Sequence, residues 1–128
     1  MNLHVDLNTD GELLLAVVTG TMSFDAVWQI LKEICDTALQ NKSTRILVDA
    51  LAAQEVLKTI DRYTIGVKLV DYCGRQKLWP RLAFVGSAPV VDGFGVLVAK
   101  NRGLDTKTFP NWKEALEWVR PAPYKRAG

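Results

Sequence analysis

A chain of 128 residues forms one domain of ordinary size, and a composition of 48% hydrophobic and 23% charged residues excludes a disordered chain. The net charge is only +2, and the charged residues are scattered along the sequence, so no basic surface large enough for nucleic acid is expected. The two cysteines lie far apart without C-x-x-C spacing, so neither a disulfide framework nor a zinc or thioredoxin-type motif is expected.

The first elements predicted along the chain are the two strands of a β-hairpin. Apolar and polar residues alternate over 3–8, which is the period of a half-buried strand. Asp10-Gly11 then supplies the tight turn, and the continuous apolar run 13–18 is typical of a strand buried within a sheet.

A strongly amphipathic helix is predicted next. Ser23 stands at the N-cap position, and Asp25 lies near the positive end of the helix dipole. Apolar residues recur at i, i+3 and i+4 spacing on one face, which is the pattern of a helix packed on a core. These residues are Phe24, Val27, Ile30, Leu31, Ile34, Cys35 and Ala38.

Short apolar runs predict the remaining strands. The runs 46–49 and 82–86 are rich in β-branched or aromatic residues, and 106–109 predicts a brief last strand. A helix over 59–73 is expected between the first two of these strands. The residues that it is expected to direct inward are Ile60, Tyr63, Val67 and Val70.

Two more helices are predicted in the second half of the chain. One covers 89–102 and closes at Gly103. The other begins at a variant capping box made by Asn111 and Glu114, and Pro121 ends it.

The predicted order, β-β-α-β-α-β-α-β-α, indicates an α/β fold. Helices that alternate with strands imply a mostly parallel sheet with helices packed on it, and the opening hairpin makes the sheet mixed. We expect one domain over residues 1–120 and a flexible C-terminal tail over 121–128. The N-terminus lacks a signal-peptide pattern and no apolar run reaches about 20 residues, so we expect a cytoplasmic protein.

Residues that could support catalysis are sparse. His4, the single histidine, falls on the polar face of the first strand, and no nucleophile elbow accompanies it. The glycine-rich stretch 86–95 lacks a Walker lysine, and close helix packing is the interpretation that we favour for it. Asp49 is either a functional carboxylate at a strand end or a residue that caps the following loop. We therefore expect no enzyme, no metal site and no cofactor.

Several segments together resemble the SpoIIAA-like branch of the STAS family. They are the hairpin, the amphipathic helix, the strand Ile46–Asp49, Thr59-Ile-Asp-Arg-Tyr-Thr-Ile-Gly66, Ala83-Phe-Val-Gly86, Val91-Asp-Gly-Phe-Gly95, Ala99-Lys-Asn-Arg-Gly103 and Glu114-Ala-Leu-Glu-Trp118. The resemblance covers nearly the whole chain, and its motifs consist of packing and turn residues. It implies a single STAS-like domain that acts without catalysis, as a regulatory or protein-interaction module.

The resemblance also bears on Thr59. Anti-sigma-factor antagonists of the family act as phosphorylation switches, with a serine in an Asp-Ser-Ser-Gly-like motif at the start of the helix after the third strand. Thr59 is the nearest hydroxyl at that location, within a motif that lacks both the preceding acid and the following glycine. Thr59 is therefore either a phospho-acceptor or, as we favour, the N-cap of its helix.

The helices predicted over 59–73 and 89–102 carry more apolar residues than one buried stripe needs, and an exposed surplus marks an interface. The candidate interface or ligand-contact residues are Tyr63, Val67, Val70, Val91, Phe94, Leu97 and Trp79. We expect a protein partner, with a second copy in a homodimer as the first choice. The alternative, suggested by lipid-binding relatives, is a small apolar or lipid-like ligand with peripheral membrane association.

Trp79 bears on the membrane alternative, because it stands between Lys77 and Arg81. An aromatic ring flanked by cations suits a water–lipid boundary, where the cations meet anionic head groups. Lys77 and Arg81 would then form the rim of a site recessed beneath the two apolar helices. The other interpretation is that Trp79 packs over the edge of the sheet.

Overall fold

One mixed sheet organises the chain in the computed structural model, which describes residues 3–54, 57–86 and 94–120. The strands lie in the order β1-β2-β3-β4-β5. They are β1 (Leu3–Asp10), β2 (Leu13–Thr21), β3 (Arg45–Gln54), β4 (Arg81–Val85) and β5 (Asp105–Phe109). β1 runs antiparallel to β2, and every other neighbouring pair is parallel. The predicted α/β class with a mixed, mostly parallel sheet is confirmed.

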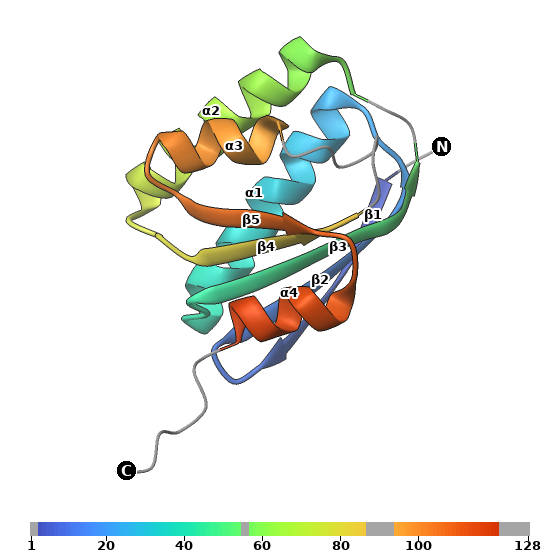
Figure 1. The fold of residues 1–128 in the computed structure, drawn as a ribbon. Helices are drawn as coiled ribbons and strands as arrows, with labels where there is room; N and C mark the ends of the chain where they lie inside the picture. Colours follow the sequence, from blue (N-terminus) through green and yellow to red (C-terminus); the bar gives the residue numbers. More distant parts are fainter. Residues whose placement is uncertain (1–2, 55–56, 87–93, 121–128) are drawn as a thin grey trace.

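Four helices cover the two faces of this sheet, in the predicted order along the chain. They are α1 (Phe24–Asn41), α2 (Thr59–Gln76), α3 (Phe94–Asn101) and α4 (Trp112–Val119). Figure 1 shows α1, α2 and α3 on one face and α4 alone on the other. The start predicted for α3 at residue 89 and the tail predicted over 121–128 lie outside the described residues.

The alternation of side chains along the inner strands divides the apolar core into two layers. In β3, Ile46 and Val48 join the layer beneath α1, α2 and α3, whereas Leu47 joins the layer beneath α4. All three are buried, because helices cover both faces of the sheet at this strand. β3 therefore lies at the centre of the fold and positions both helical layers.

The sequence signals for α1 are confirmed in the structure. The Ser23 hydroxyl accepts a hydrogen bond from the amide of Ala26 at 3.3 Å, which makes Ser23 the N-cap. The buried residues of the helix all belong to the predicted stripe. They are Ile30, Leu31, Ile34, Cys35 and Ala38.

The predicted inward face of α2 is wrong for its first two residues. Ile60 is 64% exposed and Tyr63 is 41% exposed. The stripe that faces the sheet instead consists of Ile65, Gly66, Leu69 and Cys73. Two of these residues are small and weakly apolar, so the sequence pattern favoured the larger side chains on the neighbouring face.

The capping box predicted for α4 is confirmed. The Asn111 side-chain oxygen accepts a hydrogen bond from the amide of Glu114 at 2.9 Å. The Asn111 amide group also donates to the Glu114 carboxylate at 3.0 Å, so the two side chains hold each other at the helix start.

Candidate functional site

An apolar cavity lies between the sheet and the helical layer of α1, α2 and α3. Its volume is about 130 Å³, and side chains of β2, β3, β4 and all three helices line it. Its walls come from the sheet and from three helices, and concave apolar sites of this kind are where small ligands bind.

The lining of the cavity is almost wholly apolar. Ile30 and Ile34 of α1, Ile65 and Leu69 of α2, and Phe84 of β4 all contribute to it. Among the described residues, Arg62 is the charged one in the lining, and it is half-buried near the start of α2. A water molecule needs two to four polar partners to be held in a cavity, so these walls favour an apolar occupant.

The described ligand-contact residues predicted from the sequence lie elsewhere, on α2 and α3 or, for Trp79, between α2 and β4. Tyr63, Val67, Val70, Leu97 and Trp79 do not line the cavity. α2 and α3 instead contribute Arg62, Ile65, Gly66, Leu69, Val96 and Ala99. The other two predicted residues, Val91 and Phe94, are not among those whose side chains the structure describes.

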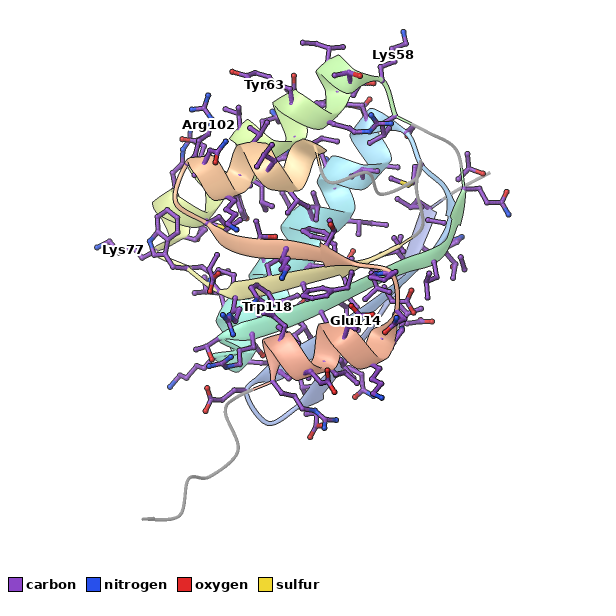
Figure 2. All side chains as sticks on the ribbon, viewed as in Figure 1. Lys58, Tyr63, Lys77, Arg102, Glu114 and Trp118 are labelled. Atoms are coloured by element: carbon purple, nitrogen blue, oxygen red, sulfur yellow. The ribbon has the colours of Figure 1, made fainter. Side chains whose placement is uncertain are left out.

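The outer face of α2 and α3, defined here by Lys58, Ile60, Tyr63, Leu97 and Arg102, combines apolar and cationic side chains. Leu97 is 52% exposed, and the Arg102 guanidinium donates to the Tyr63 hydroxyl at 3.2 Å. Figure 2 shows Lys58, Tyr63 and Arg102 along this outer side. No ion pair joins Lys58 or Arg102 to a carboxylate within the described ranges.

Trp79 and the two cations predicted beside it have different surroundings. Trp79 is 56% exposed, and its ring lies against α2 at Gly74, where an added Cβ would be 3.6 Å from it. Lys77 is exposed and forms the left-handed C-cap of α2. The Arg81 guanidinium contacts the far layer: it donates to the carbonyl of Trp118 at 2.7 Å. The role of Lys77 and Arg81 at a membrane stays a prediction.

The carboxylate of Asp49 forms part of the framework between β3 and α4. One oxygen accepts the indole N–H of Trp112 at 2.6 Å, and the other accepts the amide of Leu51 at 2.8 Å. The pairing of β2 with β3 shifts register between Val17 and Thr19, directly beside Asp49. Both interpretations that the sequence left open for Asp49 placed it at the end of a strand, whereas β3 continues to Gln54 and Asp49 lies within it, next to this irregularity in the pairing.

Two buried thiols meet where α1 packs on α2. Cys35 and Cys73 are free and buried, and they belong to the same apolar cluster. A side-chain hydrogen bond to Cys73, together with burial, raises the pKa of Cys35 above its usual range. The sequence spacing gave no sign of this contact, because the two residues lie on different helices.

A tyrosine–aspartate hydrogen bond links α1 to α2 at the surface. The Tyr72 hydroxyl donates to the carboxylate of Asp36, and its ring meets Trp28 edge-on at 5.9 Å between centroids. The hydrogen bond raises the pKa of Tyr72 to about 12, because ionised Tyr72 would lose it and face a second negative charge.

We expect a phenolate absorbance transition near pH 12 that Tyr72→Phe removes. A raised folded-state pKa means that the stabilisation is fully present below the unfolded pKa of about 10 and is lost as pH rises toward about 12. Chemical unfolding at pH 8 and pH 11 should therefore show a fall in stability for the wild type. An equal fall in Tyr72→Phe would contradict the assignment.

Thr59 is the first residue of α2, and the predicted cap role for it is wrong. The N-cap is Lys58, whose side chain makes no capping hydrogen bond. Thr59 is exposed at the helix N-terminus. Its role as a phospho-acceptor stays a prediction.

Because Thr59 caps nothing, we expect Thr59→Ala to change the free energy of unfolding by less than about 0.5 kcal/mol. Ser23→Ala, which removes a real cap, should cost about 1 kcal/mol in the same urea titration. A cost for Thr59→Ala equal to that of Ser23→Ala would show that the hydroxyl does stabilise the helix.

The residues that the sequence analysis considered for catalysis or metal binding do not come together in the described part of the chain. His4 is exposed on β1, and no group of three or more metal-ligating side chains occurs among these residues. Within the same ranges, no helix combines the length and the apolar character that crossing a bilayer requires. The cavity and the outer face of α2 and α3 are the candidate sites that we consider.

No protein-family model matches the sequence, and no curated protein is detectably similar to it in sequence. Solved structures are similar in fold. An anti-sigma factor antagonist from Mycobacterium paratuberculosis superposes with a TM-score of 0.61 at 15% identity, covering 94% of this chain and 96% of that one. An uncharacterized protein with a SpoIIAA-like fold from Shewanella loihica gives 0.58 at 15% identity, over 92% and 94% of the two chains.

The anti-sigma factor antagonist SpoIIAA in its unphosphorylated form is also similar. Its TM-score is 0.53 at 18% identity, over 89% of this chain and 96% of SpoIIAA. The likeness spans nearly the full length of all three structures and includes the strand and helix order described above. This chain therefore has the SpoIIAA-like fold of STAS domains, as the sequence resemblance implied.

Proposed function

We propose that this chain is a non-catalytic regulatory module that acts by binding another protein through the outer face of α2 and α3. The observation that carries the proposal is the exposure of Ile60, Tyr63 and Leu97 on those two helices. Exposed apolar side chains gathered on one helical layer favour a contact surface. The likeness to two anti-sigma factor antagonists, which are regulatory proteins by name, supports the same class of role.

The charges around these side chains indicate the chemistry of the partner. Lys58, Lys100 and Arg102 are exposed on the same layer and pair with no carboxylate of the described residues. Complementary potentials speed association and exclude wrong partners, so this face favours an acidic protein surface. Tyrosine and arginine are enriched where binding energy concentrates, which makes Tyr63 and Arg102 the first residues to test.

Self-association, which the sequence favoured, would require two copies of this basic face to meet if it used the same surface. Cations that oppose cations across an interface weaken it, so a different and acidic partner is the better fit. Light scattering coupled to size exclusion separates the two cases. We expect a monomer mass near 14.2 kDa at micromolar concentration, and a dimer that Arg102→Glu leaves intact would contradict the charge argument.

The proposal is tested by co-purification from the native host with four variants. Tyr63→Ser and Arg102→Glu should each reduce the recovered partner by on the order of tenfold. Leu39→Ser and Arg75→Glu are matched controls, because Leu39 is 43% exposed on α1 and Arg75 forms an exposed ion pair with Asp71 on α2. Equal recovery with all four variants would contradict the assigned surface.

A further inference from the structure

We propose that Cys35 and Cys73 form a dithiol site, at which a small oxidant such as hydrogen peroxide produces a reversible disulfide between α1 and α2. These two residues are the whole cysteine content of the chain. Both are buried, whereas the residues of the outer face of α2 and α3 are exposed. The inference therefore goes beyond the proposed protein contact and stands or fails without it.

The packing of α1 against α2 brings the two thiols together. Cys35 belongs to the buried stripe of α1 and Cys73 to that of α2, and both lie in one apolar cluster. The residues beside them join the same parts of the two helices, because the Tyr72 hydroxyl donates to the carboxylate of Asp36. A hydrogen bond also links the two cysteine side chains. Cysteines whose side chains point apart cannot be bridged without backbone movement, and these two already face each other.

The hydrogen bond gives the two thiols different roles. Donation from the Cys35 thiol lowers the pKa of Cys73, against the opposing effect of burial. The same hydrogen bond and burial raise the pKa of Cys35, so one proton leaves the pair readily and the second does not. A thiolate is the form that attacks an oxidant. Cys73 therefore reacts first, and Cys35 closes the disulfide.

The oxidation proceeds in two steps. The Cys73 thiolate attacks one oxygen of hydrogen peroxide: an S–O bond forms, the O–O bond breaks, and hydroxide leaves and is protonated to water. The Cys35 sulfur then attacks the sulfenic acid of Cys73: the S–S bond forms, the S–O bond breaks, and the released hydroxide takes the Cys35 proton to become a second water. The two thiols together give two electrons to the peroxide, and dithiothreitol reverses the change by thiol–disulfide exchange.

The product is tested on the full chain treated with hydrogen peroxide. The wild type should lose both titratable thiols and the mass of two hydrogen atoms, remain a single chain on a non-reducing gel, and recover both thiols in dithiothreitol. Cys35→Ala and Cys73→Ala are the controls, since each leaves one thiol without a partner and should form no internal disulfide. Disulfide-linked dimers of the wild type, or over-oxidised cysteines without a disulfide, would overturn the proposal.

The burial of the thiols allows a test of whether the folded chain is the form that reacts. Cys35 is 3% exposed and Cys73 is fully buried, so a reagent reaches them through a local opening of the helix pair. A small opening admits peroxide but not a bulky aromatic disulfide reagent. Compared with the chain unfolded in urea, folding should slow the aromatic reagent by roughly tenfold more than it slows peroxide. Equal slowing of both reagents would mean that only the unfolded chain reacts, and would overturn the native site.

Urea unfolding of the oxidised chain tests whether the disulfide fits the native packing. A bond between residues 35 and 73 restricts the unfolded chain, so oxidation should raise the urea midpoint of the wild type by about 1 M. Dithiothreitol should remove this rise, and Cys35→Ala treated with peroxide in the same way should not show it. A lower midpoint in the oxidised wild type would mean that the bond distorts the helix pair, and would overturn the assignment.

Discussion

Replacement of Asp49 by alanine should lower the free energy of unfolding by about 3 kcal/mol. The carboxylate accepts the Trp112 indole N–H and the Leu51 amide, so the variant loses two hydrogen bonds to a charged group. It also leaves a half-buried indole donor without its acceptor. Urea unfolding followed by tryptophan fluorescence measures the loss.

Asp49→Asn keeps the shape of the side chain but removes its charge, so it tests how much of the stabilisation depends on the carboxylate. An asparagine side chain has one acceptor oxygen, so its NH2 group would face either the indole N–H or the Leu51 amide. We expect most of the destabilisation to remain, and a cycle with Trp112→Phe to show coupling of about 1 kcal/mol or more. Asp6→Ala, on the exposed face of β1, is the control. If the losses of unfolding free energy in the Asp49 and Trp112 variants simply add in the double variant, this account is contradicted.

Replacement of Arg81 by alanine should cost about 2 kcal/mol. Its guanidinium donates to the carbonyl of Trp118, pairs with Asp105 at 3.0 Å and lies 4.1 Å from the Trp118 ring centroid. It therefore fastens the end of α4 to β4 and β5. Arg45 lies opposite Arg81 in the sheet and donates to the carbonyls of Val119 and Arg120.

Arg81→Lys should recover less than half of this loss, since an ammonium lacks the planar fork that reaches the carbonyl, the carboxylate and the ring together. Arg75→Ala is the control: its ion pair with Asp71 is exposed, and such pairs contribute about 0.5 kcal/mol or less. If thermal unfolding shows that Arg75→Ala and Arg81→Ala lose the same amount of stability, the role given to Arg81 is contradicted.

The fold could be predicted because its signals are local. The hairpin turn at Asp10-Gly11, the cap at Ser23 and the capping box at Asn111 each depend on residues within four positions of one another. The stripe of α1 was equally clear, because large apolar side chains occupy one face and charged side chains the other.

The inner face of α2 could not be predicted in the same way. Its large apolar residues, Ile60 and Tyr63, are exposed, and the buried stripe includes Gly66 and Cys73. Where apolar residues occupy more than one face, the neighbouring helices decide which face is buried. α3 and α1 pack beside α2 and select the face with small residues, which allows close approach.

The cavity depends on contacts between residues far apart in the sequence. Ile30, Ile65 and Phe84 come from three elements, and no local pattern indicates that their side chains leave space between them. Arg62 was similarly hidden, since a charged residue in the first turns of a helix is ordinarily solvated. The roles of Asp49 and Arg81 follow from the packing of α4, which brings Trp112 and Trp118 to them.

The most direct test of the proposed function is site-specific photo-crosslinking in the native host. A photoreactive phenylalanine analogue is placed in turn at Tyr63 and Leu97, which are exposed on α2 and α3, and at Leu39 on α1. The account predicts that the first two positions crosslink to the same protein, that this protein presents an acidic surface, and that Arg102→Glu suppresses the crosslink. Crosslinks of equal yield from Leu39, or none from Tyr63 and Leu97, would contradict it.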